Sequence, residues 1–382
     1  MKVAIKTLGC KVNQAESDIL ATTFSREGVE VVSFGEEADL YIVNSCAVTK
    51  EAENKTRQMV NRILRNNLAP RVILTGCYAR LISQERKNPF KEPVFLLPSF
   101  PKEREILNLV EKWWGKKFPL AEYPLPPRAR AWIKVEDGCD HFCSYCLIPH
   151  LRGEVRSEEK EKIIRQAQAL EREGIREIVL CGINLGYYGK DKEGESLITL
   201  LRELLDNTSV VRFRLSSIEP FLVDEEFIER YFSLPDRVCP HFHLPLQSGS
   251  DRILKSMRRG YDAARYRALV STLRRYSPQV AISTDIIVGF PGEEKEDFEN
   301  TVSFAQEIGF SRTHVFVFSP RPGTPAFLWE KEIGIPKTEK KNREKILREV
   351  ARENQRKYHH LFLGKKLKVL VESAQKGMGS GY

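Results

Sequence analysis

The 382-residue sequence lacks any long uninterrupted hydrophobic run, and it contains no internal repeat or low-complexity tract. A membrane-spanning helix needs about 18 consecutive apolar residues, so a transmembrane protein is excluded. The first residues, Met1 to Lys6, form too short an apolar stretch for a signal peptide. With 41% hydrophobic and 30% charged residues, the chain can bury sizeable cores, which excludes disordered and fibrous classes. We therefore expect a cytoplasmic globular protein that does not contact membranes.

Negative charge is scarce at one end of the chain. The net charge is +9, and the segment from Lys337 to Tyr382 holds thirteen Lys or Arg residues against five Asp or Glu residues. The first 336 residues are therefore close to neutral. A basic end on a neutral body favours contact with a polyanion such as RNA. A solvated, salt-bridged helix would give the same pattern, so charge alone does not identify the partner.

Cysteine is infrequent, with eight residues in the chain. A disulfide framework is not expected in a reducing compartment, which leaves metal binding or catalysis. Cys10, Cys46 and Cys77 each follow a short β-rich run. Because the carboxyl ends of parallel strands share a crevice in which ligands bind, we expect these three cysteines to converge on one metal site. Three unrelated buried thiols are the alternative.

The order of strand-like and helical patterns divides the chain into three parts. Residues 1–125 alternate the two patterns, which is typical of a doubly wound parallel α/β domain, and a Pro-rich linker follows at 123–128. Residues 126–336 predict a partial, TIM-like (β/α)6 barrel with its chemistry at the carboxyl ends of the strands. Residues 337–382 predict a basic helix, a strand at 361–372 and a flexible turn at 375–381. The barrel strands are expected at 131–135, 177–181, 211–216, 241–246, 281–288 and 313–318.

A second set of cysteines stands directly after the first barrel strand. Cys139, Cys143 and Cys146 have the spacing Cys-x3-Cys-x2-Cys. Three thiolates on one short loop suit a cubane iron–sulfur cluster, whose fourth iron is then free to chelate an amino and a carboxylate group. A structural zinc site would need a fourth protein ligand, and His141 is the candidate for that reading. The strand–helix context favours the iron–sulfur cluster.

On these residues the chain resembles the radical S-adenosylmethionine (radical SAM) superfamily, and within it the methylthiotransferase family along nearly the whole chain. The run Gly9-Cys10-Lys11-Val12-Asn13-Gln14 is similar to the subgroup that acts on N6-threonylcarbamoyladenosine (t6A) at position 37 of tRNA. It resembles less the subgroups that act on isopentenyladenosine or on an aspartate of a ribosomal protein. The other matching runs lie at 7–8, 44–46, 74–77, 215–220, 243–250, 284–293 and 319–324.

The resemblance implies two 4Fe–4S clusters and S-adenosyl-L-methionine as cofactors. The cluster on Cys139, Cys143 and Cys146 would cleave S-adenosylmethionine to methionine and a 5′-deoxyadenosyl radical, which removes hydrogen from C2 of the adenine. The cluster on the other three cysteines would hold or donate the sulfur, and a second S-adenosylmethionine would supply the methyl group, converting t6A to ms2t6A. The protein supplies placement and exclusion of water.

The resemblance also implies cofactor contacts outside the cysteines. Tyr145 is expected to pack on the adenine of S-adenosylmethionine, and Gly182 and Asn184 to meet its amino end. Glu219 and Gln247, at later strand ends, are expected to touch ribose or substrate.

The partners that the resemblance implies are an RNA and a redox protein. The RNA is the anticodon stem-loop of a tRNA that carries t6A37, bound mainly by the basic C-terminal region. The redox partner is an electron donor such as a flavodoxin or a ferredoxin. The family ends in a small TRAM-like RNA-binding β domain, and we expect only its start here. A non-enzymatic RNA-binding protein that holds structural zinc is the alternative from another class.

Overall fold

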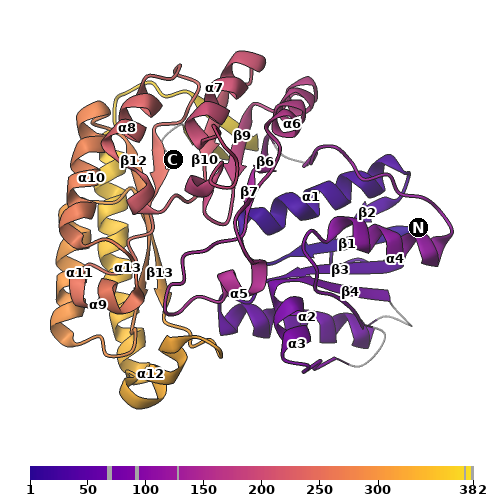
Figure 1. Ribbon diagram of the computed structural model, residues 1–382, viewed down its shortest axis with the longest axis horizontal. Coiled ribbons are helices and arrows are strands. Elements are labelled where there is room, and N and C mark those ends of the chain that lie inside the picture. Colours follow the sequence, from indigo (N-terminus) through magenta and orange to yellow (C-terminus); the bar gives the residue numbers. More distant parts are fainter. Residues whose placement is uncertain (67–70, 91–93, 127–128, 374–375, 380–382) are drawn as a thin grey trace.

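The N-terminal part is a parallel sheet with helices on both faces (Figure 1). The computed structural model describes residues 1–66, 71–90, 94–126, 129–373 and 376–379. Its first sheet has five strands in the order β2-β1-β3-β4-β5, so the chain reverses its winding direction between β1 and β3. The elements are β1 (Lys2–Thr7), α1 (Lys11–Arg26), β2 (Glu30–Val32), β3 (Leu40–Ser45), α2 (Lys50–Asn66), β4 (Arg71–Gly76), α3 (Cys77–Gln84), β5 (Val94–Leu97) and α4 (Glu103–Trp114).

Burial explains why these segments form a doubly wound sheet. Strand β3 is buried at all six positions, as expected for a central strand covered on both faces. On one face Phe24 of α1 and Ile106 of α4 belong to a common core, and on the other face Val60 of α2 packs with Leu81 of α3. The prediction of a doubly wound parallel domain is confirmed. Strands β2 and β5 are too short and too exposed to have been expected from the sequence.

The central part holds six parallel strands in the spatial order β6-β9-β10-β11-β12-β13. They form two three-stranded sheets, which parallel bridges between Phe213 and Val238 and between Ser217 and His243 join. In the described residues β6 and β13 do not pair, so the array is an open, partial barrel, as predicted. The elements are β6 (Arg130–Lys134), β7 (Glu136–Asp137), α5 (Ile148–Arg152), β8 (Arg156–Ser157), α6 (Lys160–Arg172), β9 (Glu177–Cys181), η1 (Leu185–Tyr187), α7 (Leu197–Asn207), β10 (Arg212–Leu215), η2 (Pro220–Leu222), α8 (Glu225–Phe232), β11 (His241–His243), α9 (Asp251–Met257), α10 (Ala263–Tyr276), β12 (Ala281–Val288), α11 (Lys295–Ile308), β13 (Arg312–Val317) and α12 (Pro325–Ile333).

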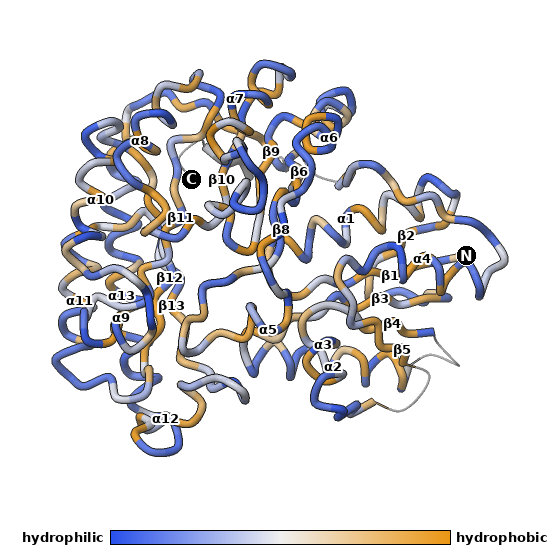
Figure 2. The backbone as a smooth tube through the Cα atoms, viewed as in Figure 1, coloured by the Kyte–Doolittle hydropathy of each residue, from blue (hydrophilic) through white to orange (hydrophobic). Residues whose placement is uncertain are grey.

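The two faces of this six-stranded array differ in character. Outward side chains such as Ile133, Phe213 and Ile282 form the largest hydrophobic core together with the surrounding helices. Figure 2 accordingly shows hydrophobic strands within an outer layer of mostly hydrophilic helix surfaces. The positions that alternate with the core residues are mostly polar. They include Glu177, Arg214, His241, His243, Asp285 and His314.

The basic C-terminal helix α13 (Lys337–His360) is part of the barrel wall. It packs against β13 and α11, and its Leu347 is fully buried. Arg343 pairs with Glu293 at 2.6 Å, and Asn354 Nδ2 donates to the carbonyl of Ala305 at 2.7 Å. The helix therefore presents its exposed basic residues from a fixed position.

The end of the chain differs from the expectation in one respect. Instead of a strand at 361–372 followed by a turn, an antiparallel hairpin is formed by β14 (Val369–Ser373) and β15 (Lys376–Gly379). Residues 374, 375 and 380–382 lie outside the described residues, and 375, 380 and 381 of these belong to the predicted turn. Pairing with β14 outweighs the poor strand propensity of the Gly-rich β15 segment.

The N-terminal domain lies directly against the barrel. Val12 and Ala15 of α1 pack on Cys181 of β9, and Trp132 of β6 joins this small core. Residues 127 and 128 of the predicted linker are outside the described residues, and the predicted domain boundaries at 125 and 336 stay predictions. Among the described helices, none is both long and apolar enough to cross a membrane.

Candidate functional site

The loop that carries Cys139, Cys143 and Cys146 follows β6 and β7 at the carboxyl end of the barrel strands. Gly138 begins it with a φ of +90°, and a Cβ there would overlap the carbonyl group of Glu154, so only glycine fits. Backbone N–H groups of His141 and Ile148 donate to the sulfurs of Cys139 and Cys146, each at 3.4 Å. These donors favour the thiolate form that a metal ligand needs.

Burial dominates the protonation of these three thiols. It raises the pKa of Cys139 to about 12 and also raises the pKa of Cys143 and Cys146. The charge of a Cys143 thiolate raises the pKa of Cys139 and Cys146 further, and a Cys139 thiolate adds to the effect at Cys146. The Arg259 guanidinium opposes the effect at Cys143, to whose sulfur it donates at 3.0 Å.

Cys10, Cys46 and Cys77 follow the neighbouring strands β1, β3 and β4 at one edge of the sheet, and their convergence on one metal site stays a prediction. A Cβ on Gly9 would lie 2.8 Å from the Cβ of Cys46, and a Cβ on Gly76 would overlap the backbone of Ser45. Gly9 and Gly76 have positive φ angles of +104° and +87°. They therefore allow the loops to approach each other. Burial raises the pKa of Cys46 to about 12 and that of Cys10 as well, and Cys77 raises both further.

The donor chemistry of both sets fits a cubane cluster. Each set offers three thiols, which matches a cluster with one open iron. Among the described residues, no group of three or more His, Cys, Asp or Glu side chains converges closely enough to hold a single metal ion. His141, the candidate fourth ligand of a zinc site, instead packs against Phe221, with ring centroids 5.0 Å apart.

Unpartnered buried polar atoms lie at the strand ends beside Cys139. The Oε1 of Glu136, both amide atoms of Asn184 and the Oγ of Ser216 are buried and have no hydrogen-bond partner. They follow β6, β9 and β10, three adjacent strands. Burial raises the pKa of Glu136 well above its ordinary value, and the N–H of Asn184, which donates to its Oε2 at 2.8 Å, opposes this only in part. Such orphaned groups are expected where a polar ligand binds.

Gly182 has a steric role in this polar set. A Cβ at Gly182 would lie 2.5 Å from the Oε2 of Glu136. The glycine therefore leaves room for the Glu136 carboxylate, and no side chain of its own reaches a ligand.

Glu219 and Tyr145 meet at Arg259. The fully buried Arg259 forms an ion pair with Glu219 and lies 3.5 Å from the hydroxyl of Tyr145. It connects the end of β10 with the loop of Cys143 and fixes the position of Tyr145. Burial raises the pKa of Tyr145 well above its ordinary value, so the hydroxyl stays neutral.

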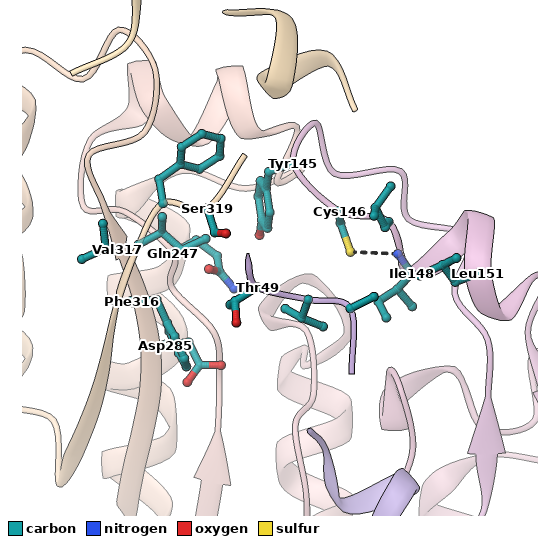
Figure 3. A pocket seen from close by; sticks show the side chains of 15 residues that line it. Thr49, Tyr145, Cys146, Ile148, Leu151, Gln247, Asp285, Phe316, Val317 and Ser319 are labelled. Carbon is teal, nitrogen blue, oxygen red and sulfur yellow. Dashed lines mark hydrogen bonds between the residues drawn. The ribbon is translucent and has the colours of Figure 1, made fainter. Parts of the chain in front are cut away.

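A pocket of about 180 Å³ lies between the segment that follows Cys46 and the loop of Cys146 (Figure 3). Thr49, close after Cys46, lines one side, and Cys146 with Tyr145 lines another. Gln247 and Asp285 of the barrel complete the wall. The backbone of Gln247 has a φ of +67° and bridges to β12: its N–H donates to the carbonyl of Asp285 at 2.8 Å, and its carbonyl accepts from the N–H of Ile287 at 2.9 Å. That bonding fixes its side chain toward the pocket.

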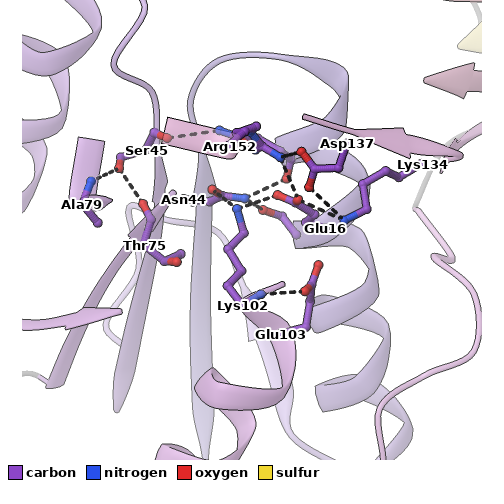
Figure 4. A network of polar contacts seen from close by, with 12 residues as sticks. Glu16, Asn44, Ser45, Thr75, Ala79, Lys102, Glu103, Lys134, Asp137 and Arg152 are labelled. Carbon is purple, nitrogen blue, oxygen red and sulfur yellow. Dashed lines mark hydrogen bonds and ion pairs between the residues drawn. The ribbon is translucent and has the colours of Figure 1, made fainter. Parts of the chain in front are cut away.

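A buried network of charges joins the two cysteine sets (Figure 4). Arg152 lies six residues after Cys146 and pairs with Asp137 at 2.7 Å and with Glu16 of α1 at 3.3 Å. Its Nη2 also donates to Asn13 Oδ1 at 2.5 Å. Asn13 Nδ2 in turn donates to the carbonyls of Leu8 and Ser45, at 2.8 and 3.1 Å. These carbonyls flank Cys10 and Cys46.

The charges in this network balance each other. Glu16 also pairs with Lys102 at 2.5 Å and with Lys134 at 3.3 Å. Burial alone would raise the pKa of Glu16, but the three cations around it hold that pKa well below its ordinary value. Burial would lower the pKa of Lys134, and the Glu16 carboxylate raises it instead. The network therefore stays ionised although it is buried.

The structure places the predicted residues in two groups. Tyr145, Gln247 and, of the six cysteines, Cys146 line the pocket. Gly182 and Asn184 instead adjoin Glu136, and Glu219 pairs with Arg259, which bonds to the Cys143 sulfur. Sequence reasoning missed Glu136, Arg152, Ser216 and Arg259. Glu136 and Ser216 flank motifs that were recognised, but a lone arginine carries no signal of its contacts. Cys181 and Cys239, which belong to neither cysteine set, are buried.

The chain matches two family models. The description "Radical SAM superfamily" matches residues 133–305, and "Uncharacterized protein family UPF0004" matches residues 2–96. The first contains the loop of Cys139, Cys143 and Cys146, and the second contains Cys10, Cys46 and Cys77.

Full-length relatives extend these matches. The chain is 41% identical to the threonylcarbamoyladenosine tRNA methylthiotransferase MtaB of Thermotoga maritima, over 100% of this chain and 89% of the relative. It is 36% identical to the tRNA-2-methylthio-N(6)-dimethylallyladenosine synthase of Dictyoglomus thermophilum, over 86% of this chain and 78% of the relative.

A solved structure shares the fold. It is the radical S-adenosylmethionine methyltransferase TsrM of Kitasatospora setae, determined with cobalamin and a 4Fe–4S cluster bound. The TM-score is 0.59 at 17% identity, over 87% of this chain and 78% of that chain. An α/β domain followed by a partial barrel is thus an arrangement found among solved radical enzymes.

Proposed function

Because the chain belongs to the radical SAM tRNA methylthiotransferase family, we propose that it inserts a methylthio group at C2 of N6-threonylcarbamoyladenosine at position 37 of tRNA. The observation that carries the proposal is the pocket that the Cys46 loop and Cys146 line together. A base held there lies against Cys146 and against the segment that directly follows Cys46. One set can then serve hydrogen removal and the other sulfur delivery at the same carbon.

Membership of the superfamily implies S-adenosylmethionine and one 4Fe–4S cluster. We assign that cluster to Cys139, Cys143 and Cys146, where it supplies the electron that cleaves S-adenosylmethionine. A second cluster, on Cys10, Cys46 and Cys77, is the finer part of the proposal. Its support is the convergence of three loops on one point although the cysteines are far apart in sequence.

The remaining residues hold and orient the cofactor. The unpartnered atoms of Glu136, Asn184 and Ser216 are available to the amino and carboxylate groups of S-adenosylmethionine. Tyr145 offers a ring for its adenine. Arg259 donates to the Cys143 sulfur, which stabilises negative charge on a ligated thiolate and tunes the cluster. An electron donor such as a flavodoxin or a ferredoxin is a required partner.

A basic groove continues from the pocket and supports an RNA substrate. The groove has a volume of about 410 Å³ and follows β13 alongside α13, and Phe316 lines both the groove and the pocket. None of its described lining residues is acidic. Cations on phosphates and an aromatic ring under a base are the usual contacts of single-stranded RNA. The polar residues that line it include Arg312, His314, Arg348, Arg352 and Gln355.

Point variants test this groove better than removal of α13, because α13 is packed into the barrel. We expect R348Q/R352Q to weaken binding of the anticodon stem-loop and to lower the slope of log K against log salt by about 1.4, for two lost phosphate contacts. The matched control is R356Q/K357Q on the same helix, where Arg356 pairs with Glu353 at 2.9 Å much as Arg348 pairs with Glu344 at 2.8 Å. Equal salt slopes for the two variants would contradict an RNA-binding groove.

Mass spectrometry of modified RNA tests the proposed activity. Reconstituted protein, S-adenosylmethionine and a reductant are incubated separately with stem-loops that carry t6A37 or isopentenyladenosine-37 and with the ribosomal protein. We expect hydrogen to be replaced by methylthio only on t6A37. Product on isopentenyladenosine alone, or on the protein aspartate, would assign the chain to another branch of the family. Neither product nor S-adenosylmethionine cleavage would contradict the enzyme assignment.

A further inference from the structure

Asp285 of β12 lies on the barrel wall of the pocket that Thr49 and Cys146 also line. Its side chain keeps 26% of its surface exposed, and Figure 3 shows its carboxylate on the barrel side of the pocket, beside Phe316. Within the described part of the chain, no group donates a hydrogen bond to its Oδ1. The pocket therefore contains a carboxylate oxygen that is accessible and available to a ligand.

A chain of buried polar side chains behind Asp285 holds it in place. The Nε2 of His243, on the neighbouring strand β11, lies 3.3 Å from the Oδ2 of Asp285. The Nδ1 of His243 lies 2.9 Å from the Oγ of Ser283, which is also 3.0 Å from the Nε2 of His241. Because both ring nitrogens of His243 face polar atoms, its ring cannot turn without losing a contact. Asp285 is thereby fixed with its Oδ1 left over.

The surroundings of Asp285 favour its ionised form. Burial would raise its pKa, but the hydrogen bond and the charge of His243, together with the charges of His314 and Lys11, lower that pKa below its ordinary value. An ionised carboxylate accepts hydrogen bonds and cannot donate them. A ligand group at Oδ1 must therefore be an N–H or an O–H.

Gln247 offers the complementary group beside Asp285. Its backbone N–H donates to the Asp285 carbonyl at 2.8 Å, and its side-chain amide has no hydrogen-bond partner among the described residues. Thr49 and Ser319 differ, because their hydroxyl oxygens accept hydrogen bonds from backbone N–H groups of α2 at 3.2 and 3.0 Å. Most of the other lining residues are apolar. The barrel wall of the pocket thus presents an acceptor next to a donor within an apolar enclosure.

This arrangement matches the edge of adenine, where the N6–H donor lies next to a ring nitrogen that accepts. We infer that Asp285 accepts a hydrogen bond from the N6–H of the target adenosine and thereby fixes the orientation of the base. The inference rests on the proposed function, and it names the residue that recognises the base itself. N6 and C2 lie on different edges of the six-membered ring, so a base held through N6 at the barrel wall turns its C2 toward the cysteine side of the pocket.

The adenine of S-adenosylmethionine carries the same N–H group and is the competing ligand. The place of Asp285 in the sheet favours the RNA base. Its partner in the register of β12 and β13 is His314, which lines the basic groove, and Phe316 lines both the groove and the pocket. Asp285 therefore stands where the groove meets the pocket.

The test removes the donor and the acceptor in turn. Reconstituted wild type, D285L and D285N are supplied with stem-loops that carry t6A37 or the same nucleoside methylated at N6, which has no N6–H. We expect wild type to prefer t6A37 by about tenfold to a hundredfold in kcat/KM, the range of one hydrogen bond to a charged group. We expect D285L to lose this preference because its rate falls only on the stem-loop with the N–H, and D285N to keep a small part of it.

The matched control is D224N. Asp224 is an exposed aspartate that caps α8 by accepting from the N–H of Phe227 at 2.8 Å, and asparagine caps a helix about equally well. This variant should keep the wild-type preference. Iron content, and the 5′-deoxyadenosine formed without RNA, are measured for every variant.

Three results would overturn the inference. Equal wild-type rates on the two stem-loops would show that the N–H is not recognised. A preference that survives in D285L would be steric in origin. A D285L defect of one size on both stem-loops and on 5′-deoxyadenosine formation without RNA would mean that Asp285 serves the adenine of S-adenosylmethionine. D285N has the shape of wild type and supplies the same comparison if D285L does not fold. If wild type forms no product on t6A37, the proposed function itself fails, which is distinct from a loss of preference.

Discussion

The two cysteine sets have the same composition and are built in opposite ways. Cys139, Cys143 and Cys146 lie on one loop, and its own turns bring the sulfurs together. Cys10, Cys46 and Cys77 each follow a different strand, so the order of the sheet brings them together. The first set depends on local backbone geometry, and the second depends on the whole N-terminal domain. Damage to the domain should therefore affect the two sites unequally.

Their surroundings differ as well. Beside the loop set lie Arg259 and several buried polar atoms without partners, as a site for a polar cofactor requires. Beside the distributed set, Asn13 holds the strand-end carbonyls, and its contacts are satisfied within the protein. Arg152 contacts residues beside both sets: it pairs with Asp137, which precedes the loop set, and it donates to Asn13 beside the distributed set. The second set is thus built as a rigid support, and the first is built to accept a ligand.

The sharpest way to break the comparison is to substitute one glycine in each set. We expect G76A to remove the iron bound by the N-terminal set, because the new Cβ would overlap the Ser45 backbone and lie 2.6 Å from Asn44 Oδ1. We expect G138A to remove the iron of the loop set, because its Cβ would overlap Glu154. Iron analysis and 5′-deoxyadenosine formation separate the two outcomes, with cleavage of S-adenosylmethionine lost only in G138A.

Gly28 supplies the control for backbone strain. Its φ is +75°, but nothing lies within 4 Å of a Cβ built there, so G28A introduces the left-handed strain of about 1 kcal/mol without a clash. Iron content should stay at the wild-type value. If G28A loses as much iron as G76A, general destabilisation explains the loss, and the close approach of the loops does not.

A smaller effect is expected when the connection between the two sets is cut. R152M leaves Glu16 and Asp137 with fewer cations in a buried place, which costs about 3 kcal/mol of unfolding free energy. We expect methylthio product to fall more than 5′-deoxyadenosine, because the two sites would lose their fixed separation while each keeps its cysteines. R156M, an exposed arginine four residues later, is the control. An equal fall in both products in R152M would mean that Arg152 serves only folding.

Much of the fold followed from pattern. The segments that were predicted as strands, such as 281–288, became strands because their apolar residues must face a helix layer on one side. The strands that were not predicted are short or depend on pairing with another strand. Strand β5 is four residues long, and β15 exists through its partner β14. Neither carries a local signal that would distinguish it from a loop.

The site divides in the same way. Six cysteines could be proposed as ligands because spacing and strand ends are local features, and Tyr145 and Gln247 stood beside recognised motifs; their roles stay predictions. Glu16, Lys102 and Arg152 could not be found. Each looks like a surface charge in sequence, and only tertiary contacts at 2.5 to 3.3 Å reveal that they neutralise each other.

The most direct test of the account is iron and acid-labile sulfide per chain after anaerobic reconstitution. The samples are wild type, the C139A/C143A/C146A variant and the C10A/C46A/C77A variant. Two independent cubane clusters predict about eight irons in wild type and about four in each variant. Wild type and the C10A/C46A/C77A variant should cleave S-adenosylmethionine, and the C139A/C143A/C146A variant should not. About four irons in wild type and none in the first variant would contradict the account, because the N-terminal cysteines would then hold no cluster.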